Sequence, residues 1–262
     1  MTKRLGLALG GGAARGLAHI GVLQALAEAK LKVDVVAGTS AGAIVGALYA
    51  GGLTARQIGQ IAERTTWAHL VRLTVPRHGL VNTSKLEDFL NTLLRGKTFA
   101  ELELPFACVA TDLVTGDEVE LREGNVAAAV RASAAVPGIM VPMVRDGRLL
   151  VDGGVVNNVP VGLARRLGAD VVVAVDVNAG AILEHNPRSI VQIILQTMEI
   201  MQRRALRDEI MAADVLLEPG TGFYSGIELD RAAEIIARGR EVALAQVDRI
   251  RGLLLAPDDV TS

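Results

Sequence analysis

The stretch LGLALGGGAARG, residues 5–16, joins an apolar run, three consecutive glycines and the start of a segment with helical spacing. The apolar run predicts a buried strand, and residues 15–29 predict the helix that follows it. Consecutive glycines allow backbone amides to turn toward a common point, and the N-terminus of a helix adds positive potential there. We therefore expect this glycine loop to bind an anionic group.

The same order of strand, turn and helix recurs along the chain. VDVVA (33–37) precedes a predicted helix at 41–50, and later β-rich runs are FACVA (106–110), EVEL (118–121), RLLV (148–151), VVVAV (171–175) and DVLLE (214–218). This alternation predicts an α/β fold, a three-layer α/β/α sandwich around a mostly parallel sheet. Gly38, Gly42 and Gly46 recur at every fourth position, so the helix at 41–50 is expected to lie close against a strand.

The chain has 262 residues, half of them hydrophobic, and no repeat or linker divides it. We predict one domain over 1–262, with its core at 5–217 and a C-terminal helix at 230–253. The net charge of −2 lacks the broad positive field of nucleic-acid-binding proteins, so no nucleic-acid partner is expected. The single cysteine, Cys108, and the absence of zinc-site spacing predict a cytoplasmic protein without a metal site.

Helix starts are predicted from capping residues. Ser84 and Glu87 form a capping-box pattern for a helix that runs through Leu94. Asn125 and Asp230 are predicted to cap two later helices.

Nucleotide-binding loops are also glycine-rich turns between a strand and a helix. Gly10, Gly12 and Gly16 miss the G-x-G-x-x-G spacing by one residue, and the second strand lacks the acidic residue that binds ribose. No Gly-Lys-Ser or Gly-Lys-Thr closes the loop. We therefore expect neither a nucleotide nor another cofactor.

Gly38-Thr39-Ser40-Ala41-Gly42 follows the second predicted strand and precedes a helix. A tight turn with glycine on both sides raises a serine hydroxyl above the sheet edge, at the positive end of the helix. Ser40 is therefore a candidate nucleophile. The alternative is that Ser40 only caps the helix that begins at Ala41.

A serine nucleophile needs a base, and the usual α/β-hydrolase order places a histidine late in the chain, after the acidic partner. Only His185 lies after the middle of this chain, in the polar turn LEHNPRS (183–189), so that order is not expected here. We interpret the histidines as structural or solvent-facing and expect a carboxylate base. Asp112, Asp152 and Asp176 each end a predicted strand, where ligands gather in parallel sheets. Asp152 is favoured because Gly153 and Gly154 behind it allow another group to approach closely, and the other two remain open on these grounds.

Four motifs in this order resemble the patatin-like phospholipases, in particular their short single-domain bacterial members. They are GGGAARG (10–16), GTSAG (38–42), ASAAVPG (132–138) and DGG (152–154), and ATDLVTG (110–116) is also similar. The resemblance covers residues 5 to about 177. It departs from the family at Gly154, where the family often has alanine.

The resemblance implies a patatin-like fold and a dyad, in which Ser40 is the nucleophile and Asp152 is the base that takes its proton. It further implies an oxyanion hole formed by the backbone amides of the glycine run, with Arg15 in the position of the family's arginine. The oxyanion-hole residues are Gly10, Gly11, Gly12 and Arg15. Ser133, in the third motif, is interpreted as structural because a turn follows it.

From these residues we expect a serine acyl hydrolase, a lipid esterase of phospholipase A type, that acts on an acyl lipid or ester through an acyl-Ser40 intermediate. A catalytically weak regulatory or lipid-binding scaffold of the same fold is the alternative. An acyltransferase would use the same intermediate.

Lipid substrates would imply peripheral contact with the inner membrane face. Arg64, Arg72 and Arg77 with Trp67 could supply it. Residues 65–82 are either a surface excursion or a lid. The apolar helix predicted at 190–206 is interpreted as core, with an interface between copies of a homo-oligomer as the alternative.

Overall fold

The computed structural model describes residues 3–73, 79–181, 187, 189–205 and 207–257. Its centre is a sheet in the order β10-β9-β1-β2-β5-β8-β7, with β6 paired to β5 beside this path. The strands are β1 (Leu5–Leu9), β2 (Val35–Thr39), β5 (Phe106–Asp112), β6 (Glu118–Leu121), β7 (Met143–Arg145), β8 (Arg148–Asp152), β9 (Val171–Val175) and β10 (Val215–Leu217). Each of the β-rich runs predicted from the sequence contributes to one of these strands.

The sheet is mostly parallel, as predicted. β10, β9, β1, β2 and β5 run in one direction, because each neighbouring pair among them is parallel. β6 and β8 pair with β5 in the antiparallel sense, and β7, which precedes β8 in the chain, forms a hairpin with it. The antiparallel pairings therefore all lie at the end of the sheet that begins with β5.

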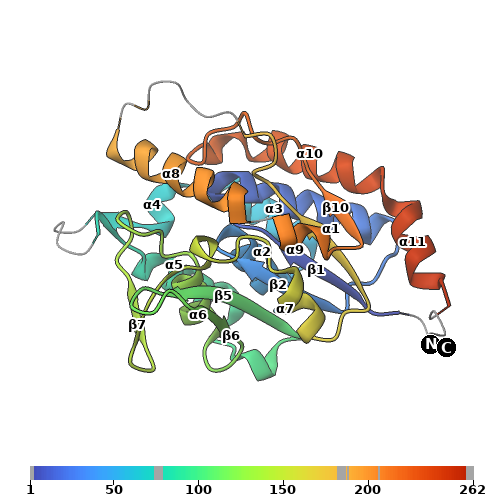
Figure 1. Ribbon diagram of the computed structural model, residues 1–262, viewed down its shortest axis with the longest axis horizontal. Helices are drawn as coiled ribbons and strands as arrows, with labels where there is room; N and C mark the ends of the chain where they lie inside the picture. The colour runs from blue at the N-terminus through green and yellow to red at the C-terminus, as the bar shows by residue number, and fades with distance from the viewer. Residues whose placement is uncertain (1–2, 74–78, 182–186, 188, 206, 258–262) are drawn as a thin grey trace.

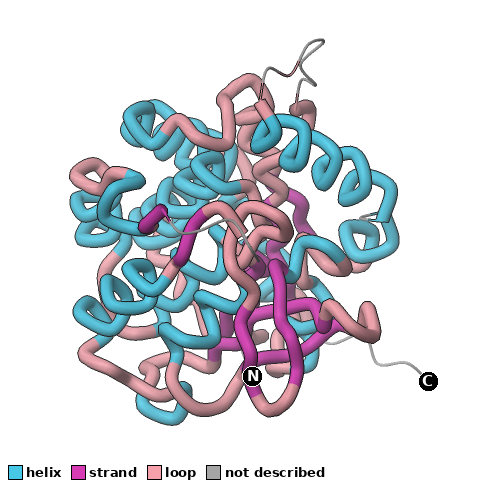
Figure 2. The backbone as a smooth tube through the Cα atoms, turned by 90° about the vertical axis from the view of Figure 1, so that its left-hand side faces the viewer, coloured by secondary structure: helices cyan, strands magenta, loops and turns pink. Residues whose placement is uncertain are grey.

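Helices cover both faces of this sheet, so the three-layer prediction is confirmed (Figures 1 and 2). One face packs against α1 (Ala18–Glu28), α2 (Ala41–Ala50), α3 (Ala55–Ala62), α5 (Ser84–Leu94), α6 (Val126–Ser133), α10 (Ala232–Leu244) and α11 (Val247–Leu255). The other face packs against α7 (Val161–Arg166) and residues around α9 (Arg207–Met211).

Two separate cores result from the alternation of side chains along each strand. In β1, Leu5, Leu7 and Leu9 point into the larger core with α1 and α2, while Ala8 points to α7. The α7 side is built mainly from alanine and valine. Small side chains there let α7 lie close to the strands.

Glycines bring helix and strand backbones into direct approach. A Cβ added at Gly42 of α2 would lie 2.0 Å from the carbonyl oxygen of Leu9, and one at Gly46 would lie 2.9 Å from Cγ1 of Val36. The glycine pattern predicted to bring this helix against a strand is therefore confirmed.

Glycines also allow close packing of α1 against α10, which run side by side in Figure 1. A Cβ at Gly21 would lie 1.9 Å from the oxygen of Ile236, and one at Gly239 would lie 1.8 Å from the oxygen of Ala18. Real Cβ atoms do not approach oxygen so closely, so both positions exclude a side chain at the present helix spacing.

Two predicted helix caps are wrong and one is confirmed. The side chain of Asn125 accepts from the Ala128 amide at 2.9 Å and caps α6. Ser84 is the first residue of α5, and its partner Glu87 instead pairs with Arg131. Asp230 lies within a short 3-10 turn, Leu229–Arg231, that leads into α10.

The C-terminal helix predicted at 230–253 is two helices, because the helical structure is interrupted between α10, which ends at Leu244, and α11, which begins at Val247.

The helix predicted at 190–206 exists as α8 (Ile190–Ala205), but its interpretation as core is wrong. Ile190 is 70% exposed and Met201 is 56% exposed. The α8 helix lies on the surface and contacts the turn that follows β8.

Within the described residues, the structure has no helix with the length and apolar character needed to cross a bilayer.

Candidate active site

Ser40 occupies the turn between β2 and α2 with φ 52° and ψ −117°. Positive φ is unusual for a residue other than glycine, and such conformations concentrate at functional sites. The Ser40 amide donates to Oγ of the fully buried Ser133 at 3.0 Å, so Ser133 has the structural role predicted for it. The side chain of Ser40 makes no capping hydrogen bond to α2, which contradicts the alternative that it only caps the helix.

The register of the sheet brings Asp152 to this turn. Val109 of β5 pairs with Thr39, and the next residue, Ala110, pairs with Asp152. β8 runs antiparallel along the part of β5 that extends past β2, and its last residue stops level with Ser40. Its neighbour Gly153 leaves room for this approach, because a Cβ there would lie 2.2 Å from the Val109 oxygen.

The two side chains meet, and their environment sets the basicity of the carboxylate. The Ser40 hydroxyl donates to Asp152, and the Gly154 amide donates to Oδ1 of Asp152 at 2.7 Å. Burial raises the pKa of Asp152 to about 6, because desolvation of the charged form outweighs these two hydrogen bonds. A carboxylate with this pKa is a better proton acceptor than one with an ordinary value, and it is still ionised at neutral pH.

This pKa predicts the pH dependence of any reaction in which Asp152 is the base. Only the ionised carboxylate can take the Ser40 proton, so kcat/KM should be level above about pH 6. Below that pH it should fall about tenfold per unit. The measurement is kcat/KM for a soluble nitrophenyl ester between pH 4.5 and 8.5. A profile without a change near pH 6 would contradict the assignment of Asp152.

Acid unfolding must be excluded in the same experiment. Burial lowers the pKa of His19 to about 4, from 6.5 for a free histidine. The unfolded chain therefore takes up this proton first, and the folded state loses stability as the pH falls from about 6.5 toward 4. Fluorescence of the single tryptophan, Trp67, at each pH shows whether the protein stays folded.

The other two candidate aspartates do not meet Ser40. Oδ1 of Asp112 accepts from the Val114 amide, and Oδ1 of Asp176 accepts from the Asn178 amide. Both side chains serve the turns that follow their strands.

The two histidines within the described ranges are engaged elsewhere. His19 is buried with Nε2 2.7 Å from the Gly10 oxygen, and Nδ1 of His69 accepts from the Thr66 amide. Their interpretation as structural or solvent-facing agrees with these contacts. His78 and His185 lie outside the described residues.

The glycine run offers fewer amide donors than predicted. The Gly10 amide donates to the Val175 oxygen and the Gly11 amide to the Asn158 oxygen, both at 3.1 Å. In the part of the chain that the structure describes, the amides of Gly12 and Ala13 have no hydrogen-bond partner. Of the predicted Gly10, Gly11 and Gly12 amides, only that of Gly12 is therefore open to a ligand, and the Ala13 amide joins it.

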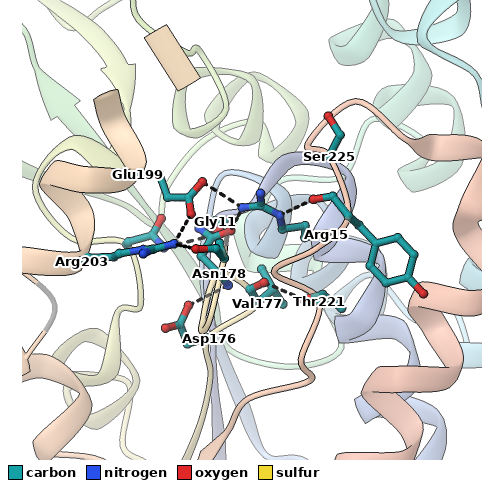
Figure 3. Close-up of polar contacts among 12 residues, drawn as sticks. Gly11, Arg15, Asp176, Val177, Asn178, Glu199, Arg203, Thr221 and Ser225 are labelled. Carbon is teal, nitrogen blue, oxygen red and sulfur yellow. Dashed lines mark hydrogen bonds and ion pairs between the residues drawn. The ribbon is translucent and has the colours of Figure 1, made fainter. Parts of the chain in front are cut away.

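The guanidinium of Arg15, the fourth residue predicted for the oxyanion hole, is already bound. Nε donates to the Tyr224 oxygen at 2.8 Å, and Nη1 donates to Oδ1 of Asn178 at 3.0 Å and to Glu199 at 3.2 Å (Figure 3). The arginine thus joins the glycine loop to α8 and to the chain after β9.

Two asparagines of the site were not predicted from the sequence. The side-chain amides of Asn158 and Asn178 both donate to the carbonyl oxygen of Gly11, at 3.2 Å and 3.0 Å. The sequence signal was weak, because each follows a predicted site aspartate by only a few residues and asparagine is common in turns.

Ser40 lies at the junction of two cavities. A cavity of about 90 Å³ is lined by Gly12, Arg15, Asp152 and side chains of α8. It is called the polar cavity here because charged and amide side chains line it together with apolar ones. An apolar cavity of about 140 Å³ is lined mainly by aliphatic side chains of α2, α3 and α5 and by α4 (Trp67–Leu70). Thr65, Trp67, Leu70 and Val71 of the segment 65–82 thus supply part of a cavity wall, while residues 74–78 of that segment lie outside the described residues. Among the described residues, no group of three His, Cys, Asp or Glu side chains could hold a metal ion.

Fold and site together define an α/β protein with a serine and a buried aspartate at the carboxyl edge of a mostly parallel sheet. The family model "Patatin-like phospholipase" matches residues 7–165. The chain belongs to this family.

Relatives with related names support this assignment. An uncharacterized NTE family protein of Mycobacterium tuberculosis is 38% identical over 180 residues, which are 68% of this chain and 50% of the relative. The human patatin-like phospholipase domain-containing protein 6 is 38% identical over 185 residues, 67% of this chain and 13% of that protein. The chain thus spans half or less of the length of these relatives.

Solved structures share the fold at low sequence identity. VipD from Legionella pneumophila has a TM-score of 0.55 with 14% identity, over 95% of this chain and 67% of that one. ExoU from Pseudomonas aeruginosa, in its complex with SpcU, has a TM-score of 0.54 with 15% identity, over 97% of this chain and 53% of that one. These likenesses confirm the fold class.

Proposed function

We propose that the protein is a serine acyl hydrolase that cleaves fatty-acyl esters, as a lipid esterase of phospholipase A type. The observation that carries the proposal is the hydrogen bond from Ser40 to a buried aspartate of raised pKa, placed between an apolar and a polar cavity. Membership of the patatin-like phospholipase family supports a lipid ester as substrate.

In the proposed first half-reaction, Asp152 takes the hydroxyl proton while Oγ of Ser40 bonds to the ester carbonyl carbon. The carbonyl oxygen becomes an oxyanion beside the open amides of Gly12 and Ala13. Collapse of this intermediate breaks the bond to the alcohol oxygen, which receives the proton from Asp152. The acyl group remains on Ser40.

The second half-reaction reverses the roles of the same groups. Asp152 takes a proton from water, the water oxygen attacks the acyl carbon, and Ser40 leaves with the proton returned to it. An alcohol in place of water would make the product a new ester, so the acceptor decides between hydrolysis and acyl transfer.

The two cavities suggest how the ester is oriented. Aliphatic residues such as Ile44, Leu48 and Ile58 line the apolar cavity, which suits the acyl chain. Arg15, Asn178 and Glu199 line the polar cavity, which suits the alcohol part of the substrate. Oγ of Ser40 between them would then face the carbonyl that joins both parts.

A fluorophosphonate with an alkyl chain tests the nucleophile directly, since it phosphonylates activated serines. We expect one label per folded molecule, mapped to the peptide that contains Ser40, and no labelling of urea-unfolded protein. Ser133 provides an internal control, because its fully buried hydroxyl should stay unlabelled. Absence of label from Ser40 in folded protein would contradict the proposed function.

A further inference from the structure

We propose that Asn158 and Asn178 are positioning residues that aim the Gly12 amide at the substrate's oxyanion. The inference rests on the proposed function, because it concerns the same reaction. Neither asparagine is required to touch the reacting atoms. Each acts through the peptide bond between Gly11 and Gly12, whose oxygen both side chains bind.

The glycine loop is held at successive peptide groups. The Gly10 amide donates to Val175, and the Gly10 oxygen lies 2.7 Å from Nε2 of the buried His19. The Gly11 amide then donates to the backbone oxygen of Asn158. These contacts fix the strand side of the loop and leave the Gly11–Gly12 peptide as the one next to the cavity.

This peptide is held by its oxygen alone. Its C=O accepts two side-chain amides, while its N–H, on Gly12, has no partner among the residues that the structure describes. In a trans peptide the C=O and N–H point in opposite directions. Holding the oxygen against the two asparagines therefore turns the Gly12 N–H away from them.

The Gly12 amide belongs to a loop that lies against the nucleophile. A Cβ added at Gly11 would lie 3.1 Å from Cβ of Ser40, and Gly12 lines the polar cavity together with Ser40 and Asp152. Two hydrogen bonds to the Gly11 oxygen also polarise the peptide, which makes the N–H on its other side a stronger donor.

The orientation of the Asn178 side chain follows from its partners. Arg15 can only donate hydrogen bonds, so the Asn178 atom 3.0 Å from its Nη1 must be the oxygen, Oδ1. The amide nitrogen is then the atom that faces the Gly11 oxygen. Arg15 is in turn held by Glu199 and by the Tyr224 oxygen, so the asparagine is supported on its outer side (Figure 3).

The orientation of Asn158 follows from the Gly11 oxygen alone, because its own Oδ1 has no hydrogen-bond partner among the described residues. Its side chain is 4% exposed, and the atom 3.2 Å from the Gly11 oxygen must be a donor, because two oxygens at that distance would repel. Both asparagines thus present N–H groups to one carbonyl oxygen.

Leucine is the test substitution, because it has nearly the same size as asparagine and cannot donate. We expect Asn158→Leu and Asn178→Leu each to lower kcat for a nitrophenyl ester about tenfold, and the double variant about hundredfold or more, with little change in KM. Asn157→Leu is the matched control. Asn157 is an equally buried neighbour, but its side chain binds Glu118 and not the glycine loop.

A decyl trifluoromethyl ketone reports on the oxyanion itself. Ser40 adds to its carbonyl carbon, Asp152 takes the proton, and the ketone oxygen becomes an oxyanion without a leaving group to expel. Its Ki should rise by the same factor as kcat falls in the Asn158 and Asn178 variants. The Kd of 1-decanol, which uses only the apolar cavity, should stay unchanged. Asn157→Leu should alter none of these values.

The experiment distinguishes failure of the positioning role from failure of the proposed function. Unchanged ketone affinity in both variants, or equal losses in the Asn157 control, would overturn the positioning role. Should leucine at 178 prevent folding, Asn178→Asp takes its place, because a carboxylate still pairs with Arg15 but donates nothing to Gly11. Failure of the proposed function would show differently, as wild-type protein without Ser40-dependent hydrolysis.

Discussion

Ser40→Ala and Asp152→Asn should each lower kcat/KM for a soluble nitrophenyl ester by at least about a thousandfold. Alanine removes the atom that forms the acyl intermediate. Asparagine keeps the shape of Asp152 and can still accept the hydrogen bond from the Gly154 amide, but it cannot take the serine proton. The measurement is steady-state hydrolysis at pH 7.5, with circular dichroism to show that both variants fold.

Asp112→Asn is the matched control for the base. Asp112 is also buried and also ends a strand, but it binds the Val114 amide and does not contact Ser40. Its substitution should leave kcat/KM within about twofold of the wild type, the scatter expected of a substitution remote from the chemistry. Hydrolysis that survives both Ser40→Ala and Asp152→Asn would reject the dyad. A wild-type protein that binds acyl lipids without turning them over would instead favour the scaffold alternative.

Gly239→Ala should cost about 3 kcal/mol of unfolding free energy. The new Cβ would lie 1.8 Å from the Ala18 oxygen, on the backbone of a helix that cannot yield by rotating a side chain. α1 and α10 must therefore separate, which opens the larger core along their contact. Urea denaturation followed by circular dichroism measures the loss.

The control for this stability effect is Gly252→Ala in α11, where the added methyl would have nothing within 4 Å. Alanine favours helix over glycine by up to about 1 kcal/mol, so this variant should be as stable as the wild type or slightly more so. Equal stability of Gly239→Ala and the wild type would show that the two helices are not held at the described spacing.

Local patterns were sufficient to predict most of the fold. A β-rich run identified seven strands of the central sheet, whereas β7, which has only three residues, was not predicted. The glycine spacing in residues 38–46 predicted close packing that the structure confirms. The wrong caps at Ser84 and Asp230 are local failures, whereas the misinterpretation of residues 190–206 concerns long-range context. Residues 190–206 have the apolar content of a core helix, but α8 lies on the surface because the sheet face is already covered by other elements.

The site could be predicted only as a set of candidates. Sequence motifs selected Ser40 and Asp152, and the family resemblance paired them. Residues alone could not do so, because the direction of β8 and its register on β5 decide which aspartate faces the serine. The amide donors of the loop were misplaced for a similar reason. Which N–H groups stay open depends on Val175 and Asn158, far along the chain.

Because β8 supplies Asp152, its place in the chain also determines when the site can first be complete during synthesis. A growing chain that ends before residue 148 carries the serine turn but not the strand that delivers its carboxylate. Such a chain would hold an unactivated hydroxyl even with β1, β2 and β5 already paired. The acyl hydrolase proposed above would thus stay inactive on the ribosome until β8 has paired with β5.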